Sequence, residues 1–466
     1  MIVKFPVATG GYAPRMKFEL IGNRSAPECF HLADLVRAFS YALDLTEGQP
    51  AGHCVRTCWI GSNVGRALGL GASELSDLYY ALLLKDLGCS SNAARICELY
   101  GADDRAFKRG YKTVGTSLAA TLVFVARNSA PRQPLHKRSA TVGNILRNGV
   151  AIADEMILSR CTRGSDIARN LGFSLAVQQG IYHLDEHWDG SGRPDHRCGE
   201  AVPLISRIAL LAQVADVFHT HAGRDAAIAE VKRRSGSWFD PRLVSLFLEV
   251  ARSDEFWAQL QSPFLDARIT SLLPADETRP VDEDSLDAIA TAFGQVIDAK
   301  SPYTADHSRR VGELAIGVAD AMGVPQSRRR GLYRAALLHD VGKLGVSNAI
   351  LDKPGPLDQR EWNEMRGHAS HTFEILNRIE PLHEMAAIAA GHHERLDGRG
   401  YPFGLSDQLI RRETRIITVC DFYDALSSKR PYREALDRED ALAIMSESVG
   451  AAIDPDCFEA LRRLTH

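Results

Sequence analysis

Apolar residues recur every three to four positions along most of this 466-residue chain, the spacing of one face of an α-helix. One such face comprises Leu286, Ile289, Phe293, Val296 and Ile297. A second runs from Val311 to Met322 and is followed by Gly323, a typical helix stop. Runs that alternate apolar and polar residues between turn signals are nearly absent. The pattern therefore predicts an all-α protein.

A short acidic segment interrupts this periodicity. Residues 273–284 contain two prolines and no repeating apolar position, which is typical of a linker. A chain of this length exceeds one ordinary core, so two or three domains are expected. We predict a first domain over residues 1–272 and a second over residues 285–466.

The two predicted domains look like divergent copies of one unit. Lys85 follows His53 by 32 residues, and His339 follows His307 by the same number. Each of the two stands directly before an aspartate in a similar apolar run. The matched segments are 83–88 with 337–342, 186–194 with 394–402, and 207–208 with 415–416. One interval is 46 residues longer in the first copy, which places an insertion between about residues 101 and 157.

Seven side chains of the second copy carry the donor atoms of a transition-metal site. They are His307, His339, Asp340, His368, His392, His393 and Asp421. Imidazole and carboxylate without thiolate suit first-row divalent ions rather than a structural zinc site. Seven ligands are too many for one ion but fit two ions that share a bridging group, as in phosphoryl transfer.

Helical geometry adds detail to this set. Lys343 follows Asp340 by three positions, so it lies on about the same helix face, where its cation can neutralise a phosphate oxygen. Adjacent His392 and His393 would diverge by about 100° on a helix and could each serve a different metal. A histidine alone on a helix is more often a core or surface residue. His371, His383 and His466 are assigned to that class.

These residues resemble a known family. His307, the run 339–343 and Asp421 resemble the HD phosphohydrolase superfamily, and residues 392–402 are similar to its HD-GYP subfamily. The resemblance covers nearly all of residues 285–464. It implies an HD-type helical domain that hydrolyses 3′-5′ cyclic dinucleotides with two or three metals. Cyclic di-GMP is the main substrate implied, with linear pGpG as the product; whether hydrolysis continues to GMP stays open from the sequence.

The resemblance also implies roles for single residues. Asp340 should bridge the metals and Lys343 should contact the scissile phosphate, while Tyr401, Arg430 and Arg433 match positions that hold the nucleotide. An arginine fork suits a phosphate, and a tyrosine ring can stack on a base. On its own, an arginine in such a loop is more often a solvated charge.

One position departs from the family pattern. Three-metal members carry a glutamate four residues before the first histidine, where this chain has Tyr303. A phenol is a poor substitute for a bridging carboxylate at neutral pH. We therefore expect two divalent transition metals, Fe or Mn in preference to Ni, Co or Zn.

The first copy has lost most of these ligands. Aligned by the equal spacings, Lys85 replaces His339, Arg160 replaces His368, Leu184 and Asp185 replace the His-His pair, Gln213 replaces Asp421, and Cys89 replaces Lys343. Only His53 and Asp86 survive. Cations where ligands belong would repel divalent ions, so we expect tandem HD-type domains with an intact metal site only in the second. Lys85 is expected to form a buried ion pair with Asp86 or Asp185.

The insertion is strongly basic. Between Arg105 and Arg147 there are nine Lys or Arg and no Asp or Glu. A solvated surface is the ordinary interpretation of such a run. Contact with a nucleotide, a nucleic acid or an acidic partner is the alternative.

Composition restricts the remaining function classes. The formal net charge of -4 lacks the basic footprint of a nucleic-acid-binding protein. Nine cysteines without a C-x-x-C pair argue against a disulfide scaffold or zinc knuckle. The longest apolar stretch, residues 118–126, is far shorter than the roughly 20 residues that span a membrane. Without a signal-peptide core in residues 1–18, we expect a cytoplasmic protein with no membrane segment.

Three functions stay open from the sequence. The first is a cyclic di-GMP phosphodiesterase, with the first copy as scaffold, homodimer surface or regulator. The second is the same chemistry on 3′3′-cyclic GMP-AMP, because the metal motif does not report the base. The third is a receptor that binds a cyclic dinucleotide without hydrolysis, against which the complete ligand set and Lys343 argue.

Overall fold

The computed structural model describes residues 31–465 except 115–117, 131–134, 275–276 and 278. All its named elements are helices, and the described residues contain isolated β-bridges but no strand. The predicted all-α class is therefore confirmed. Within the described part, no helix combines the length and apolar composition needed to cross a bilayer.

The first half contains thirteen described α-helices and two short 3₁₀ helices, labelled η. They are α1 (Leu32–Thr46), α2 (His53–Leu68), α3 (Ala72–Leu84), η1 (Cys89–Asn92), α4 (Ala93–Tyr100), α5 (Asp104–Lys112), α6 (Leu118–Asn128), α7 (Leu135–Asn170), α8 (Leu175–Tyr182), η2 (Gly199–Ala201), α9 (Leu204–Ala222), α10 (Arg224–Arg233), α11 (Pro241–Val250), α12 (Asp254–Leu260) and α13 (Leu265–Thr270).

The second half follows a non-helical connection and has the same helical character. Its elements are α14 (Glu283–Asp298), α15 (His307–Ala321), α16 (Gln326–Leu338), η4 (Val341–Gly345), α17 (Asn348–Leu351), α18 (Gln359–Leu376), η5 (Glu380–Leu382), α19 (His383–Ala390), η6 (Gly391–His393), η7 (Asp407–Leu409), α20 (Arg412–Ser427), α21 (Arg438–Ser446) and α22 (Pro455–Leu464). Asp282 caps α14 by accepting from the Ser285 amide. Gly323 follows α15 with a φ of 66°, the left-handed conformation expected of a helix stop.

The internal repeat has a counterpart in side-chain geometry. Each half buries a histidine whose Nδ1 lies 2.7 Å from an aspartate, and that aspartate also accepts from an arginine at 2.6 Å. These triads are His53–Asp216–Arg56 and His307–Asp424–Arg310. Along the chain their histidines and aspartates are 163 and 117 residues apart, a difference of 46 residues that matches the insertion.

A close helix crossing repeats as well. A Cβ added at Gly88 would lie 1.9 Å from the carbonyl oxygen of Arg160, and one at Gly342 would lie 1.9 Å from that of His368. Only glycine permits such an approach of two backbones. The crossing pairs Arg160 with His368, the same correspondence that the sequence spacing predicts.

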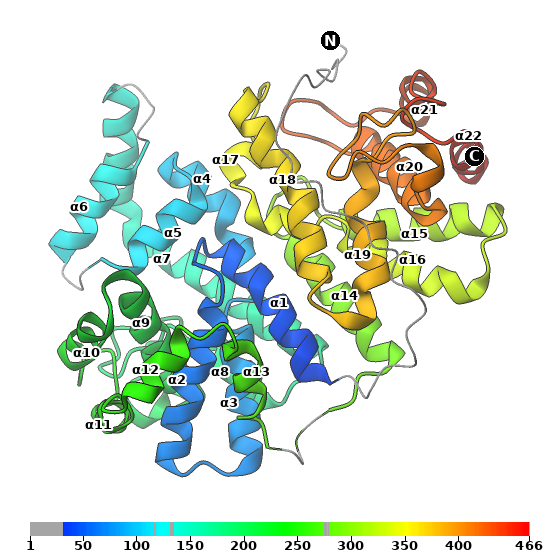
Figure 1. Cartoon of the computed structure of the whole chain (residues 1–466). Coiled ribbons are helices and arrows are strands. Elements are labelled where there is room, and N and C mark those ends of the chain that lie inside the picture. Colours follow the sequence, from blue (N-terminus) through cyan, green and yellow to red (C-terminus); the bar gives the residue numbers. More distant parts are fainter. Residues whose placement is uncertain (1–30, 115–117, 131–134, 275–276, 278, 466) are drawn as a thin grey trace.

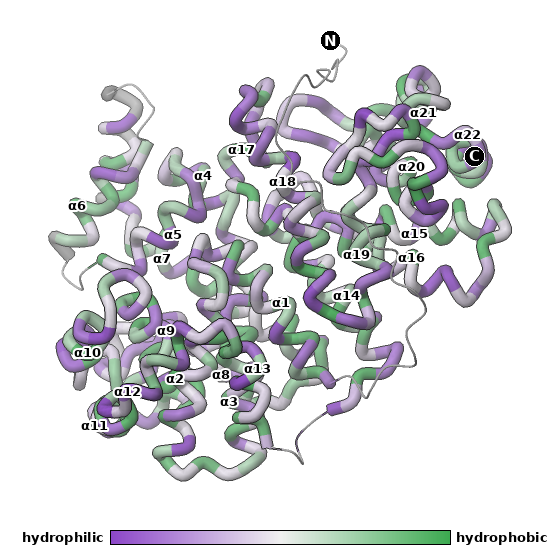
Figure 2. Tube along the Cα trace, in the orientation of Figure 1, coloured by the Kyte–Doolittle hydropathy of each residue, from purple (hydrophilic) through white to green (hydrophobic). Residues whose placement is uncertain are grey.

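The two halves share one continuous core. Phe39 of α1 stacks on Phe293 of α14 with ring centroids 4.0 Å apart. Helix α1 lies between the first-half helices and the second half, where it packs on η4 and α18 (Figure 1). Figure 2 shows hydrophobic and hydrophilic positions interleaved along the helices of both halves, as expected for helices that bury one face. The second half is thus built directly against the first.

The predicted insertion forms α5, α6 and the first part of α7, which extends away from the body in Figure 1. The basic side chains of α5 contact other parts of the protein. Arg105 donates to the backbone carbonyl of Gly345. Lys108 and Lys112 both pair with buried Glu47, at 3.3 and 2.8 Å. These charges are used within the protein, so this part of the run is not a free anion-binding surface.

Candidate metal centre

The seven predicted ligands come together in one place, although they lie far apart in the sequence. His307 starts α15, His339 and Asp340 link α16 to η4, His368 lies in α18, His392 and His393 lie in η6, and Asp421 lies in α20. Five are buried, whereas His393 and Asp421 are partly exposed. The structure therefore brings together the whole predicted set.

Two local details differ from the expected helical placement. Helix α16 ends at Leu338, so His339 and Asp340 stand at its C-terminal end. His392 and His393 lie on a 3₁₀ turn, where successive side chains diverge by about 120° because each turn has three residues. Both differences direct adjacent side chains toward different parts of the cluster.

Asp340 stands between two groups of histidines. Its Oδ2 atom lies 3.3 Å from Nε2 of His339 and 3.5 Å from Nε2 of His307. Its Oδ1 atom lies 3.5 Å from Nε2 of His368 and 3.6 Å from Nε2 of His392. A carboxylate that offers one oxygen to each group is suited to bridge two ions.

The donor atoms around Asp340 form two compact sets. Within each set, the atoms all lie within 4.8 Å of one another. The sets are His368, His392 and His393 on one side, and His307, His339 and Asp421 on the other. Each set has the nitrogen and oxygen donors that suit a divalent transition metal, without a thiolate.

The imidazole rings are held from behind. Nδ1 of His339, His368 and His392 lies 2.7, 2.6 and 2.7 Å from the backbone carbonyl three residues earlier. Nδ1 of His307 lies 2.7 Å from Oδ2 of Asp424. A hydrogen on Nδ1 leaves the Nε2 lone pair facing the cluster, the form required of a metal ligand.

Burial and neighbouring charges set the protonation of these groups. Burial lowers the pKa of His368 to about 4 and that of His392 to about 3, so both rings are neutral at pH 7. For His307, burial also lowers the pKa, but its contacts with the carboxylates of Asp340 and Asp424 outweigh it and raise the pKa to about 9. A proton on His307 then supplies positive charge beside the carboxylates.

Several inward-facing atoms lack a hydrogen-bond partner in the described part of the chain. They are Nε2 of His307, Nε2 of His339 and Oδ1 of Asp340, all buried. Unpaired buried polar atoms are costly, and those of native proteins usually have a function or bind an ion. The residues present therefore fit divalent metal ions.

Lys343 lies at the open side of the cluster. Its ammonium contacts Oδ2 of Asp340, and its side chain is 20% exposed while that of Asp340 is 1% exposed. Burial raises the pKa of Asp340, but the charge of Lys343 outweighs it and holds that pKa well below the usual range. The lysine thus reaches both the buried carboxylate and the solvent from which an anionic ligand would arrive.

Tyr401 borders the same cluster. Its ring centroid lies 4.8 Å from that of His393, and the guanidinium of Arg366 lies 5.2 Å from the Tyr401 centroid. Arg366, two positions before His368, was not recognised from the sequence. Glu394 holds the loop around Tyr401, because its carboxylate accepts from the Phe403 amide at 2.6 Å and from two further amides.

The other predicted nucleotide contacts lie after α20. Arg433 donates to the carbonyls of Leu426 and Ala425, both at 2.8 Å, so its guanidinium caps the C-terminal end of that helix. The Arg430 amide donates to the Arg433 carbonyl at 2.8 Å, and the two residues form an isolated bridge. The structure places Arg433 in a loop-holding contact and leaves its predicted role toward nucleotide untested.

Asp424 and Arg310 adjoin the cluster, and their places beside it were not predicted from the sequence. Asp424 accepts from His307 at 2.7 Å and from Arg310 Nε at 2.6 Å, and so fixes the ring of a predicted ligand. Its position three residues after Asp421, on the same helix face, was the available signal. At Tyr303, which is half-buried, the chain offers a phenol and no carboxylate.

In the first half, ion pairs occupy the equivalent place. Lys85 contacts Asp86, and both side chains are 1% exposed, which confirms the expected pair. Arg160 pairs with Asp185. Burial lowers the pKa of Lys85, but the charge of Asp86 outweighs it and raises that pKa, so the lysine is charged.

A third group of possible metal donors lies beside this pair. Donor atoms of Glu47, Asp86 and Cys89 lie within 4.8 Å of one another. However, Lys108 and Lys112 pair with Glu47, and these cations already balance the carboxylates. This group therefore does not resemble the histidine-rich sets of the second half.

Comparison with known proteins places both halves in one family. The HD domain model matches residues 145–243 and 292–457. The 3′3′-cGAMP-specific phosphodiesterase 3 of Vibrio cholerae is 51% identical over 438 residues, which are 94% of this chain and 95% of that protein. A crystal structure described as a cyclic GMP-AMP specific phosphodiesterase of V. cholerae matches with a TM-score of 0.65 and 46% identity, covering 93% of this chain and 97% of that one.

A second group of relatives matches a smaller part of the chain. The cyclic di-GMP phosphodiesterase response regulator RpfG of Xanthomonas campestris is 36% identical over 194 residues, which are 41% of this chain and 50% of that protein. Similarity therefore extends over both halves for the V. cholerae phosphodiesterase 3 and over less than half of the chain for RpfG.

Proposed function

This chain belongs to the HD domain family, and from that premise we propose that it hydrolyses 3′3′-cyclic GMP-AMP. It is a cyclic-dinucleotide phosphodiesterase. One observation carries the choice of substrate: the 51% identity to a 3′3′-cGAMP-specific phosphodiesterase over 94% of the chain. The sequence alone ranked cyclic di-GMP first, and the comparisons support its alternative better.

The catalytic half is proposed to hold two divalent metals. His368, His392 and His393 would bind one, and His307, His339 and Asp421 the other, with Asp340 between them. The paired donor sets and the unpaired inward-facing atoms support this number. Iron or manganese is proposed from the nitrogen and oxygen donors. Such ions would supply Lewis acidity and charge neutralisation for attack of water on the phosphodiester.

The chain's own residues have separate tasks. Lys343 is proposed to neutralise a non-bridging phosphate oxygen, because its ammonium reaches both Asp340 and solvent. Tyr401 and Arg366 are proposed to offer an aromatic face and a cation to a base. Arg430 is proposed to contact phosphate from the loop that Arg433 holds against α20.

The first half, proposed as a domain over residues 1–272, then serves as a metal-free scaffold. Its equivalent site is filled by the Lys85–Asp86 and Arg160–Asp185 pairs. The linker over residues 273–284 and the catalytic domain over residues 285–466 complete this proposal. A homodimer through the first half remains a prediction, which sedimentation of the purified chain would test.

The substrate proposal is tested by turnover of the metal-loaded protein. Initial rates with 3′3′-cyclic GMP-AMP, cyclic di-GMP and cyclic di-AMP are compared, and the products are separated chromatographically. We expect kcat/KM to favour 3′3′-cyclic GMP-AMP by at least about tenfold, a difference that a few base contacts provide. Equal or faster cleavage of cyclic di-GMP would contradict the proposal. Tight binding without cleavage of any of them would identify a receptor instead.

A further inference from the structure

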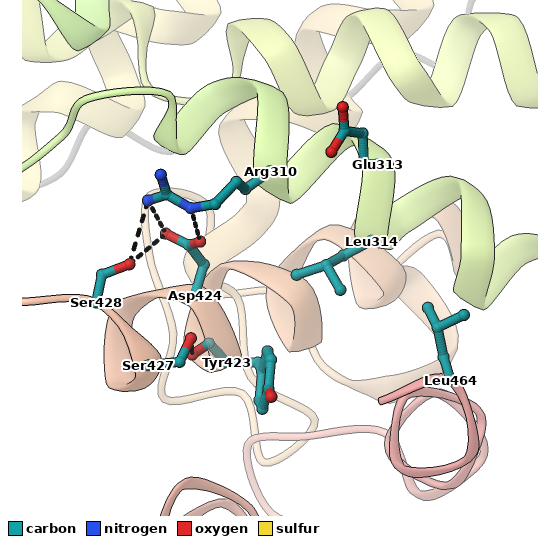
Figure 3. Close-up of a pocket in the computed structure, with 8 residues that line it drawn as sticks. All are labelled: Arg310, Glu313, Leu314, Tyr423, Asp424, Ser427, Ser428 and Leu464. Carbon is teal, nitrogen blue, oxygen red and sulfur yellow. Dashed lines mark hydrogen bonds and ion pairs between the residues drawn. The ribbon is translucent and has the colours of Figure 1, made fainter. Parts of the chain in front are cut away.

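A groove of about 470 Å³ lies beside the His307–Asp424 pair, between α15, α20 and α22 (Figure 3). This volume falls within the range of about 300–1,000 Å³ that is usual for ligand pockets. Figure 3 shows Leu314 and Leu464 on one side of it and Arg310 with its partners on the other.

The polar side of the groove is already satisfied. Arg310 donates to Asp424 from Nε at 2.6 Å, to Ser428 from Nη2 at 3.1 Å and to the carbonyl of Ala305 from Nη1 at 2.7 Å. All three nitrogens of the guanidinium are therefore engaged. The surface left for a ligand is mainly that of Leu314, Tyr423 and Leu464, so an anion is a poor occupant and an apolar group is a good one.

The internal repeat identifies the equivalent groove in the first half. Trp59 stands six residues after His53, as Glu313 stands six residues after His307. His219 stands three residues after Asp216, as Ser427 stands three residues after Asp424, so these two residues also correspond. Helix α11 corresponds to α22, since each begins with a proline after an aspartate cap.

In the first half this equivalent groove is covered by α12. Trp59 donates to the carbonyl of Phe256 at 3.1 Å, and their rings stack with centroids 6.3 Å apart. The ring of His219 lies 5.1 Å from that of Trp257. Phe256 and Trp257 are only 4% and 6% exposed. A short helix with aromatic side chains is thus the occupant that this fold accommodates at this position.

The groove of the second half lacks such a cover. Among the described residues, nothing takes the place of α12, and Leu464 at the end of α22 is 43% exposed. The rim also differs, because Glu313 stands where the first half has Trp59. Glu313 pairs with Arg309 at 2.7 Å, but both side chains are more than half exposed. Such a surface pair contributes little and is readily exchanged for another cation.

We propose that this groove binds a short helix of a partner protein, one that presents a large aromatic side chain beside Ser427, the counterpart of His219, and against the apolar surface of Leu314, Tyr423 and Leu464. A basic side chain one position earlier would face Glu313, in the place that Phe256 takes against Trp59. The occupant is thus the counterpart of α12, with its first aromatic replaced by a cation to match the acidic rim.

A peptide copied from α12 tests this proposal with the full-length, metal-loaded protein. The probe is a fluorescently labelled peptide of residues 252–262 with Phe256→Arg, titrated by fluorescence anisotropy. We expect saturable binding that is weakened at least about tenfold by Leu464→Glu in the protein. A matched control, Leu409→Glu, changes another exposed leucine outside the groove and should leave binding unchanged. Trp257→Ala in the peptide should abolish binding.

Three outcomes would overturn the proposal. The first is no saturable binding, and the second is binding that Leu464→Glu and Leu409→Glu affect equally. The third is self-association of the protein without peptide that Leu464→Glu abolishes, which would make a second copy the occupant. Thermal unfolding of both variants establishes that each is folded, and the peptide variant provides a test that does not depend on changing the protein.

Discussion

The carboxylate of Asp104, in the first half, accepts a hydrogen bond of 2.9 Å from the backbone amide of Asn348 in the second half. It also lies 3.6 Å from the ammonium of Lys300, and neither side chain is more than 1% exposed. The neighbouring Arg105 donates to the carbonyl of Gly345, at the end of the turn that follows Asp340. The two halves are therefore joined by buried polar contacts close to the metal centre.

Replacing one partner of the Asp104–Lys300 ion pair should lower the stability of the protein more than replacing both partners. Asp104→Ala leaves Lys300 buried without its carboxylate, which should lower the free energy of unfolding by about 3–5 kcal/mol. Asp104→Ala combined with Lys300→Met removes the orphaned charge and should recover part of the loss. Thermal and denaturant unfolding measure both. A double variant that is no more stable than Asp104→Ala would show that the ion pair is not the cause.

Metal content should report the two donor sets separately. His368→Ala removes one ligand of a single set, so it should leave about one ion per protein, whereas Asp340→Ala removes the carboxylate that both sets share. We expect the Asp340 variant to lose most of both ions. Elemental analysis of the purified variants measures this, with His371→Ala as a control at a histidine outside the cluster. Equal metal loss in the His368 and Asp340 variants would contradict two separable ions.

Metal uptake should release about one proton at pH 7.5. His307, with a pKa of about 9, is protonated at that pH, whereas His368 and His392, with pKa values near 4 and 3, are already neutral. Since a ligand must lose its proton, metal affinity should rise with pH up to about pH 9. Calorimetric titration in buffers of different ionisation enthalpy counts the protons. His307→Gln should remove the release, and a release of three protons would refute this assignment.

Lys343 should act on the phosphate and not on metal binding. Lys343→Gln is expected to lower kcat by about 10²- to 10³-fold, the usual effect of losing one charge-stabilising donor, while metal content stays unchanged. Lys343→Arg keeps the charge and should retain part of the activity. Loss of metal together with activity in Lys343→Gln would instead indicate that the lysine supports the cluster through Asp340.

In the first half, charge pairs should support the fold and not the reaction. Lys85→Met leaves Asp86 buried and unpaired, which should cost about 3–5 kcal/mol of stability. Lys85→Met with Asp86→Leu should be less destabilising, and neither should change the metal content of the second half. Stability is followed by thermal unfolding and metal by elemental analysis. Metal loss in the folded double variant would show that the first half contributes to the centre directly.

Much of the site was predictable because its residues carry their chemistry in type and order. Imidazoles and carboxylates at the spacing from His307 to Asp421 predicted a metal cluster, and the structure brings all seven together. The replacement of His339 by Lys85 likewise predicted a buried ion pair, which the structure contains. Asp424 escaped notice, since its contact with His307 joins residues 117 positions apart.

The basic insertion shows the limit of a one-dimensional pattern. Nine cations without an acid between Arg105 and Arg147 left open an anion-binding surface. Lys108 and Lys112 instead pair with Glu47, which lies far outside the run in the sequence. Whether a charge is free or paired depends on residues that the fold brings to it, and local charge counts do not include them.

The sequence by itself determined the helical class, the duplicated unit, the ligand types and the loss of those ligands in the first half. Those properties follow from periodicity and residue identity, which are local. Only the tertiary structure decided that the two oxygens of Asp340 face different histidine sets, that Asp104 joins the halves, and that the groove covered by α12 has a counterpart that no described residue covers in the same way. These relationships depend on distances between residues far apart in the chain, which packing fixes and spacing does not.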